Sequence, residues 1–360
     1  MKIAIYHNLD KGGALVQLEK LIEKIKVDHD VHIFSPNEVL KNITKTTHHF
    51  YKTTQPSNLY SYLLHATIEL PQINKNISIE ILRNNFDVVY VFPCKVLQSP
   101  DIIRFLKNKN LLYFFAERKR EFYEKTSYDY FSIKRTMARI LRFPVQLKDF
   151  INCRNADKII TNSIFSNSIL NRTYGKKSIV IYPGMKHVVP INKKVANTDK
   201  AIIVGQLSYT KGYDIAFNLL SNAGYREVTV IGRKTDDFNQ IINISSNLGI
   251  KINLLETEDD DEKDKLYKKH GVFIACQRNE PFGITTLEAC YNNNIVFGLN
   301  EGGTSEIIHH GLNGFLFDKE SIINASKLLS MLRIRKSTNI IKINTIDWRI
   351  MAEKIISISK

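Results

Sequence analysis

The sequence predicts an α/β fold made of two doubly wound domains in tandem. Three observations support this prediction. Short apolar runs alternate with helical patterns along the whole chain of 360 residues. The runs are continuously apolar, as expected for parallel strands buried on both faces. A polar, irregular segment containing Pro190 separates two series of such runs, and the length at about 150 residues per domain also fits two domains.

The first series has the βαβ rhythm of a parallel sheet covered by helices. Strands are expected at residues 3–7, 31–34, 88–92, 111–115, 158–161 and 178–182. Helices are expected between them, at about 14–26, 58–69, 76–84, 101–108, 145–156 and 164–172.

The second series repeats the rhythm. Its strands are expected at residues 201–204, 227–231, 251–255, 272–275, 295–298 and 314–317. Its helices are expected at about 212–223, 236–248, 261–270, 285–293, 303–309 and 319–333.

These series define the expected domains: a first at 1–185, a linker at 186–199, a second at 200–340 and a C-terminal helix within 341–360. The last helix has an apolar stripe at i, i+3, i+4, i+7 and i+8, and we expect it to cross back to the first domain. The stripe is formed by Trp348, Met351, Ala352, Ile355 and Ile356. Ligands bind beyond the carboxyl ends of strands in open α/β sheets, so we expect a site in a cleft between the two domains.

The net charge of +15 lies in one half of the chain. Residues 1–195 contain 31 Lys and Arg against 16 Asp and Glu, whereas residues 196–360 contain 20 of each. This asymmetry suggests a polyanionic partner for the first half, such as a membrane surface, a phosphorylated acceptor or nucleic acid, although a solvated face rich in lysine is also consistent with it.

The four cysteines show no metal-binding or redox spacing, which favours a reducing, cytoplasmic location. No stretch approaches the about 20 apolar residues needed to span a bilayer. Any membrane contact is therefore expected to be peripheral, on the inner face.

Two segments of the second half carry the strongest chemical signals. Gly205 and Lys211 lie between a strand and a helix, where a lysine at the helix start is explained by a bound phosphate or, more simply, by a surface position. Residues 279–289 place Glu280 before a turn at Gly283 and Glu288 inside a helix. Two carboxylates can accept hydrogen bonds from ligand hydroxyls, but Thr285 and Glu288 also have the spacing of a capping box that needs no ligand.

Taken in order, the motifs resemble glycosyltransferase family 4, which has the GT-B fold of two Rossmann-like domains, and the resemblance covers nearly the whole chain. The motifs are Gly12-Gly13, 155–157 through 161–163, 182–184, Gly205-Gln206-Leu207 with Lys211-Gly212, Glu280-x7-Glu288, Gly302-Gly303 with Glu306, 311–316 and Asp347-Trp348.

The resemblance implies roles for matching residues. Lys211 would bind the donor diphosphate, Glu280 the donor-sugar hydroxyls and Glu288 the nucleotide ribose. The sugar and phosphate would face backbone N–H groups of Phe282, Gly283, Ile284 and Thr285. Leu255 and Glu256 would contact the nucleobase, and Gly12 and Gly13 would approach the phosphate and the acceptor.

Two positions depart from the family pattern. Gln206 stands where the family often has an arginine on the diphosphate, and Arg233 is the candidate to replace that charge. No histidine follows the fourth expected strand. Glu117 is the candidate substitute there, although a charged, solvated helix start is an equally good interpretation.

The resemblance implies a retaining hexosyltransferase that moves a sugar from a UDP- or GDP-sugar to a glycan or lipid-linked acceptor in cell-surface polysaccharide or lipopolysaccharide biosynthesis. Glu280, Lys211 and Glu117 are the expected catalytic residues, with no protein nucleophile. No cofactor or metal is expected, because the acidic run at 258–262 is better explained as a helix N-terminus. A sugar-nucleotide epimerase or phosphorylase of the same fold, and a basic nucleic-acid-binding protein, remain alternatives, the latter without a supporting motif.

The basic surplus is concentrated around residues 131–151, where Lys134, Arg135, Arg139, Arg142 and Lys148 alternate with apolar side chains. This composition is typical of an interfacial helix on anionic lipid. We therefore expect peripheral contact of the first domain with a membrane.

Overall fold

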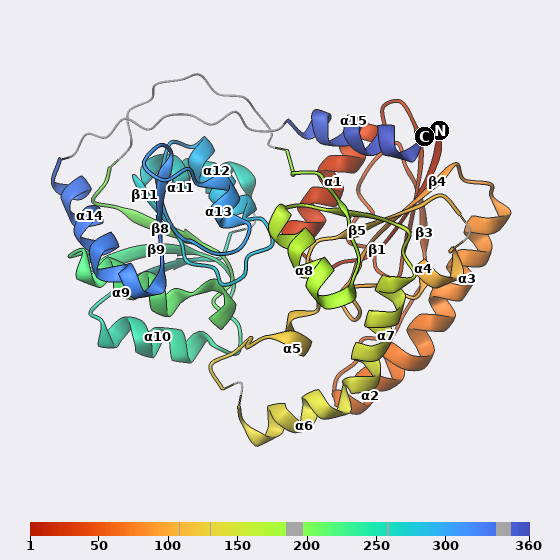
Figure 1. Ribbon diagram of the computed structural model, residues 1–360, viewed down its shortest axis with the longest axis horizontal. Helices are drawn as coiled ribbons and strands as arrows, with labels where there is room; N and C mark the ends of the chain where they lie inside the picture. The colour runs from red at the N-terminus through yellow and green to blue at the C-terminus, as the bar shows by residue number, and fades with distance from the viewer. Residues whose placement is uncertain (108, 130, 185–196, 258, 336–346) are drawn as a thin grey trace. The chain divides into compact units, whose positions relative to one another are not determined.

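The computed structural model describes all residues except 108, 130, 185–196, 258 and 336–346 (Figure 1). The chain forms two compact units. Unit 1 comprises Met1–Glu124, Phe131–Lys186 and Ile346–Lys360, and unit 2 comprises Lys125–Tyr130 and His187–Thr345. Most of the expected linker, residues 186–196, lies outside the described residues.

Within its described residues, unit 1 contains a parallel sheet of seven strands in the order β3-β2-β1-β4-β5-β6-β7. The strands are β1 (Lys2–Asn8), β2 (Asp30–Ser35), β3 (Thr47–Phe50), β4 (Val88–Cys94), β5 (Leu111–Phe115), β6 (Lys158–Thr161) and β7 (Ile179–Val180). The strand order reverses between β1 and β4, the kind of switch point where such sheets bind ligands.

Helices cover both faces of this sheet. They are α1 (Gly13–Ile25), α2 (Leu59–Leu64), the π-turn η1 (His65–Glu69), α3 (Leu70–Arg83), α4 (Ile102–Phe105), α5 (Arg120–Tyr123), α6 (Ile133–Leu141), α7 (Phe143–Arg154), α8 (Ile164–Tyr174) and α15 (Trp348–Ser359). Along β1, Ile3 and Ile5 pack with α1, whereas Ala4 and Tyr6 face a second core that includes residues of α3. This double burial explains the continuously apolar strands.

Unit 2 has a parallel sheet whose six described strands run in the order β10-β9-β8-β11-β12-β13. They are β8 (Ala201–Val204), β9 (Glu227–Ile231), β10 (Lys251–Leu255), β11 (Val272–Ala275), β12 (Ile295–Leu299) and β13 (Gly314–Phe317). The helices are η2 (Tyr209–Lys211, a 3₁₀ turn), α9 (Tyr213–Asn222), α10 (Phe238–Asn247), α11 (Asp260–Lys269), α12 (Ile284–Tyr291), α13 (Thr304–Ile307), η3 (Lys319–Ser321) and α14 (Ile322–Arg335). The prediction of two parallel, doubly wound sheets is confirmed.

Three details differ from the prediction. Strand β3 was not predicted because its sequence, Thr-His-His-Phe, has no apolar run; it is an edge strand in which His49 stacks on Phe34. Helices α2 and α3 are joined by η1 into one helical segment from residue 59 to 83. The basic stretch at 131–151 forms two helices, with Pro144 in the first turn of the second.

The C-terminal helix α15 packs on α1, which confirms the predicted return to the first domain (Figure 1). Trp348, Met351, Ala352 and Ile355 are buried with residues of α1 and β1 in one core. The backbone of Gly184 lies so close to Trp348 that an added Cβ would be 2.0 Å from its nitrogen. At the other end of the helix, the hydroxyls of Tyr90 and Ser359 form a 2.7 Å hydrogen bond.

We expect Trp348→Ala to lower the free energy of unfolding of unit 1 by about 3–5 kcal/mol, because truncating a buried aromatic side chain leaves a cavity. Urea unfolding followed by far-ultraviolet circular dichroism measures the loss. Ile350→Ala, on the exposed side of the same helix, is the control and costs less than about 1 kcal/mol. Equal losses for the two variants would contradict the role of this stripe.

Candidate active site

The Lys211 loop connects β8 to α9. Gly205 follows the strand, η2 ends at Lys211, and Gly212 adopts a left-handed conformation before the helix begins. The aliphatic stem of Lys211 passes over Gly205, where an added Cβ would be 3.3 Å from Cδ of the lysine. The glycine therefore leaves room for the lysine to turn back toward the end of the sheet.

Lys211 and Glu280 are 69 residues apart in sequence, yet they form an ion pair. The Nζ of Lys211 is 2.8 Å from Oε2 of Glu280, and the two side chains are 22% and 17% exposed. Strand β8 pairs with β11 in parallel, so the loops that follow these strands lie at the same edge of the sheet. The structure thus brings together two of the three expected catalytic residues.

The Glu280 loop is supported by the Gly302-Gly303 turn. The N–H of Gly303 donates to the carbonyl of Glu280 at 2.7 Å. A Cβ on Gly303 would be 2.4 Å from the carbonyl oxygen of Pro281, and one on Gly302 would be 2.7 Å from that of Glu280. The two glycines are therefore required because another backbone segment occupies the space of their side chains.

Helix α12 begins without a side-chain cap. Gly283 is its N-cap residue, in a left-handed conformation, and makes no side-chain cap hydrogen bond, so the expected capping box of Thr285 and Glu288 is wrong. The expected box places Thr285 at the N-cap, whereas the helix already begins at Ile284. Gly283 has no side chain with which to cap the N–H groups of the first turn.

Two buried hydroxyls lie beside Gly283. The Oγ1 atoms of Thr304 and Thr286 are 3.1 and 3.3 Å from the position of a Cβ at Gly283. Neither oxygen makes a hydrogen bond to any other described residue. They add polar groups to the start of α12.

Glu288 is half-buried on α12 and accepts a hydrogen bond from the hydroxyl of Tyr267 at 3.0 Å. Burial raises the pKa of the Glu288 carboxyl, and the ammonium of Lys263 opposes that rise. The carboxyl keeps one well-oriented partner and further acceptor capacity for a ligand.

Arg233, the candidate to replace the arginine that the family often has at position 206, contacts Gln206. The guanidinium of Arg233, in the loop after β9, donates to the side-chain oxygen of Gln206 at 3.4 Å. The backbone carbonyl of Arg233 also accepts a hydrogen bond from the N–H of Leu207 at 2.9 Å. Leu255 and Glu256, at the end of β10, are exposed.

Sequence reasoning missed Arg278, which fixes the Lys211 loop. Its guanidinium donates to the carbonyl of Tyr209 at 2.6 Å and to Asp214 at 2.5 Å, and lies 4.2 Å from the centre of the Tyr209 ring. Its N–H donates to the carbonyl of Thr210. A lone arginine between an apolar strand and a Glu-Pro-Phe-Gly motif gives no sequence signal of this role.

Tyr128 was also missed. It belongs to the short segment Lys125–Tyr130, which comes from the first half of the chain but is part of unit 2. Its hydroxyl donates to Asp214 at 3.2 Å, and its ring packs edge-on against Tyr209.

The remaining expected residues lie in unit 1. Gly12 is the N-cap of α1, with nothing within 4 Å of an added Cβ, and Gly13 is the first residue of the helix. Glu117 follows β5 and is half-buried in a charged group of residues, where Arg120 pairs with Glu124 at 3.0 Å.

The chain is similar to known glycosyltransferases. Residues 188–347 match the family model of the glycosyl transferases group 1. An uncharacterized glycosyltransferase of Methanocaldococcus jannaschii is 25% identical over 325 residues, covering 86% of this chain and 81% of the relative. The human alpha-1,3/1,6-mannosyltransferase is 24% identical over 217 residues, covering 52% of each chain.

A solved structure, that of Anabaena HepE in complex with UDP and glucose, has the same fold with a TM-score of 0.64. It is 17% identical, and the similarity covers 100% of this chain and 97% of HepE. The two parallel sheets and this similarity show the GT-B fold. The chain is thus a glycosyltransferase whose residues 188–347 match the group 1 family, and it transfers a sugar from a nucleotide-sugar donor.

In the part of the chain that the structure describes, no group of three or more His, Cys, Asp or Glu side chains is arranged to hold a metal ion. In the same part, no helix has both the length and the apolar composition required to cross a bilayer.

We expect Arg278→Lys to weaken nucleotide binding about tenfold or more, because lysine cannot hold the Tyr209 carbonyl and Asp214 together in one planar fork. Isothermal titration calorimetry with UDP and GDP measures the change.

Arg333 provides a matched control elsewhere in unit 2. It also combines a backbone carbonyl (Gly224, 2.8 Å), a carboxylate (Asp199, 2.8 Å) and a tyrosine ring (Tyr225, 4.7 Å). Arg333→Lys is expected to reduce stability by about 1–2 kcal/mol and to leave nucleotide affinity unchanged. Unchanged affinity in Arg278→Lys would show that Arg278 has no part in positioning the loop.

Proposed function

We propose that this protein is a retaining hexosyltransferase that moves a sugar from a UDP- or GDP-sugar to a glycan or lipid-linked acceptor in cell-surface polysaccharide or lipopolysaccharide biosynthesis. The observation that carries the proposal is the Lys211–Glu280 pair at the adjoining ends of β8 and β11. The complex of HepE with UDP and glucose supports a UDP-sugar, and the human mannosyltransferase supports a hexose.

Lys211 binds the diphosphate of the donor in this proposal. An ammonium has three N–H donors, so Lys211 can keep its hydrogen bond to Glu280 while the others contact phosphate oxygens. Arg233, next to Gln206, adds a second positive charge on the same side of the loop. The uncapped start of α12, at Gly283, Ile284 and Thr285, supplies N–H groups to phosphate and sugar.

Carboxylates recognise the hydroxyl groups of the donor. Glu280 binds the transferred sugar, and Glu288, held by Tyr267, binds the ribose. Leu255 and Glu256, at the end of β10, are proposed to contact the nucleobase. The hydroxyls of Thr286 and Thr304 are buried beside Gly283 and add polar groups beneath the start of α12.

The chemistry follows from charge. Departure of the nucleoside diphosphate leaves negative charge on phosphate and positive character on the sugar ring. Lys211 stabilises the negative charge on the phosphate, and Glu280 stabilises the positive character of the sugar ring. The acceptor hydroxyl attacks from the side of the leaving group and gives its proton to the departing phosphate, so the anomeric configuration is retained and no protein nucleophile is needed. Gly12, Gly13 and Glu117 are proposed to act on the acceptor side, with Glu117 in place of the family histidine.

We also propose that unit 1 contacts anionic membrane peripherally through α6. The helix has no buried residue, and its apolar side chains are among the most exposed of the described chain: Ile133 is 85% exposed and Ile140 is 62% exposed. Exposed apolar groups on this scale mark an interaction surface. Lys134, Arg135 and Arg139 on the same helix make that surface complementary to anionic headgroups.

Donor binding is testable with a thermal-shift panel of UDP-, GDP- and ADP-sugars. We expect one UDP- or GDP-sugar to raise the melting temperature of the wild-type protein, because a ligand that binds only the folded state stabilises it. Lys211→Ala and Glu288→Ala are expected to lose about 10- to 100-fold in affinity through lost charged hydrogen bonds.

Lys268→Ala, which removes an exposed lysine paired with Asp264 on α11, is the control and is expected to respond as the wild type does. If no nucleotide sugar stabilises the wild type, or if all variants respond alike, the site assignment is wrong.

Membrane contact is testable by co-sedimentation with vesicles containing phosphatidylglycerol. We expect binding at low salt that weakens as the salt concentration increases. The double variant Ile133→Ser, Ile140→Ser is expected to lose about tenfold or more in vesicle affinity, because serine has no apolar surface to bury in the lipid. Ile334→Ser, an isoleucine 76% exposed on α14, is the control. Binding that is absent, or that persists in the double variant, would refute the proposal for α6.

A further inference from the structure

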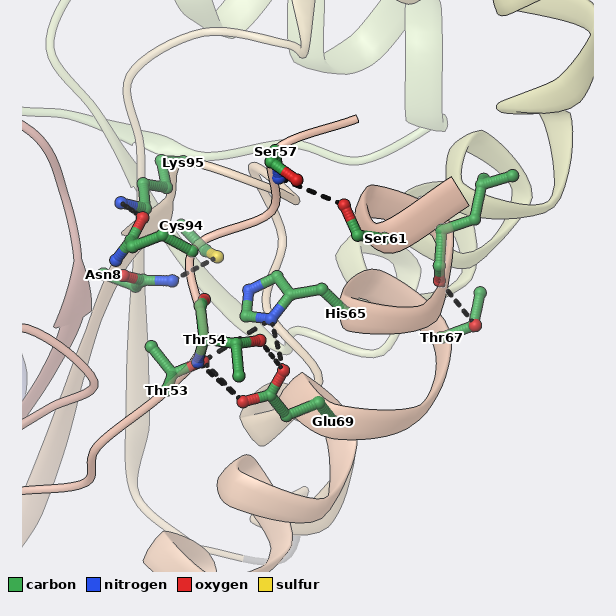
Figure 2. Close-up of polar contacts among 12 residues, drawn as sticks. Asn8, Thr53, Thr54, Ser57, Ser61, His65, Thr67, Glu69, Cys94 and Lys95 are labelled. Atoms are coloured by element: carbon green, nitrogen blue, oxygen red, sulfur yellow. Dashed lines mark hydrogen bonds and ion pairs between the residues drawn. The ribbon is translucent and has the colours of Figure 1, made fainter. Parts of the chain in front are cut away.

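A buried histidine and a half-buried glutamate in unit 1 form a pair that has no role in the donor site. His65 and Glu69 are the first and last residues of the π-turn η1. The Nδ1 of His65 is 2.9 Å from Oε2 of Glu69, and the histidine is 2% exposed. Figure 2 shows Glu69 beside one ring nitrogen, with the other nitrogen, Nε2, turned away from it.

Four hydrogen bonds fix the carboxylate of Glu69. The N–H of Thr54 donates to Oε1 at 2.8 Å, the hydroxyl of Thr53 donates to the same oxygen at 3.1 Å, and the hydroxyl of Thr54 and the ring of His65 donate to Oε2 (Figure 2). Burial acts to raise the pKa of Glu69, but the hydrogen bonds from His65 and Thr54 outweigh it and lower the pKa to about 2. Glu69 is therefore ionised at neutral pH.

This arrangement sets the protonation of the imidazole. An ionised carboxylate can only accept hydrogen bonds, so Nδ1 carries the proton. In the neutral ring Nε2 then presents a lone pair. Among the described residues, the hydrogen bonds of the His65 ring all involve Nδ1 and none involves Nε2. The free lone pair is suited to a hydroxyl group of a ligand.

The π-turn has a local cause that does not explain the pair. The N–H of Leu70 donates to the carbonyl of His65, five residues earlier. Pro71 follows Leu70 and has no N–H to donate to the carbonyl of Thr67. The wider turn accommodates this missing hydrogen bond. Such turns occur near proline and are also frequent at functional sites. Nothing in the bulge requires a histidine at 65 or a glutamate at 69.

The pair lies at the carboxyl edge of the sheet of unit 1. Thr53 and Thr54 come shortly after β3, and Ala66, next to His65, packs in one cluster with Cys94 at the end of β4. Open α/β sheets bind ligands at this edge. Another polar group lies there, because Lys95, directly after β4, contacts both Asp10 and Gln55 at 3.2 Å.

Charge indicates a neutral ligand. Lys95 faces Asp10 at 3.2 Å, Lys148 faces Asp101 at 2.9 Å, and His65 faces Glu69. The two lysines are each matched by a carboxylate, and Glu69 is ionised beside the neutral form of the His65 ring, so these three pairs offer no surplus positive charge to a phosphate. Neutral, hydroxyl-rich molecules fit such a set of donors and acceptors.

We propose that His65, oriented by Glu69, binds a hydroxyl group of the acceptor sugar through Nε2. The assignment rests on the proposed function, since it requires that a sugar acceptor occupies unit 1. His65 is a binding residue in this scheme and takes no proton, because the departing phosphate of the donor accepts it.

The first test is direct binding. The probes are the methyl α-glycosides of glucose, mannose and galactose, with inorganic phosphate as a separate arm, added to protein with ¹⁵N-labelled histidine. We expect at least one glycoside to shift the Nε2 resonance of His65, and Glu69→Gln to weaken that response about tenfold, because the amide no longer fixes the tautomer. Glycosides that leave the resonance unmoved, or phosphate as the sole effector, would overturn the proposal.

The second test uses the donor sugar that stabilises the wild-type protein. Transfer to the bound glycoside is compared with hydrolysis of the donor by water. We expect His65→Ala to lower the ratio of transfer to hydrolysis about tenfold and His65→Gln, whose amide oxygen can accept a hydrogen bond, to restore part of it.

Thr67→Ala is the matched control, because Thr67 lies in the same π-turn and its hydroxyl bonds only to the Leu63 carbonyl among the described residues (Figure 2). An unchanged ratio in His65→Ala would overturn the proposal. Failure of the proposed function has a different signature, namely that the wild type neither hydrolyses nor transfers from any donor.

Discussion

The parallel pairing of β8 with β11 is the constraint on which the donor site depends. Two strands that run side by side in the same direction must release their following loops at the same edge, whatever their separation in sequence. This is why Lys211 and Glu280 meet at 2.8 Å and why Arg278, two residues before Glu280, can hold the Tyr209 carbonyl. The Gly302-Gly303 turn, after β12, adds a third loop at the same edge.

Much of this architecture was predictable from sequence because parallel strands buried on both faces are continuously apolar. Strands β5, β8 and β11 were predicted with their observed limits. β3 was not, because an edge strand is held by specific contacts, such as His49 on Phe34, that leave no apolar pattern. The same applies to η1, where a proline within a helical segment changes the hydrogen-bonding pattern without ending the segment.

The site was predictable only where its residues lie in a recognisable motif. Glu280 and Lys211 were found in this way, and the structure shows them in contact. Arg278 and Tyr128 were missed because their roles arise from tertiary contacts with Tyr209 and Asp214. The capping box expected at Thr285 and Glu288 is a motif with the right spacing that does not form. The helix begins at Ile284, and Glu288 accepts a hydrogen bond from Tyr267.

The position of α15 has a consequence for the order in which the chain acquires its structure during synthesis. Trp348, Met351 and Ile355 fill the same core as Ile3 and Leu18, although they leave the ribosome more than three hundred residues later. Unit 2 is therefore made in full while one face of the unit 1 sheet still lacks part of its cover. A nascent chain paused before residue 348 would expose apolar surface of α1, so chaperones that act during translation have a defined target in this protein.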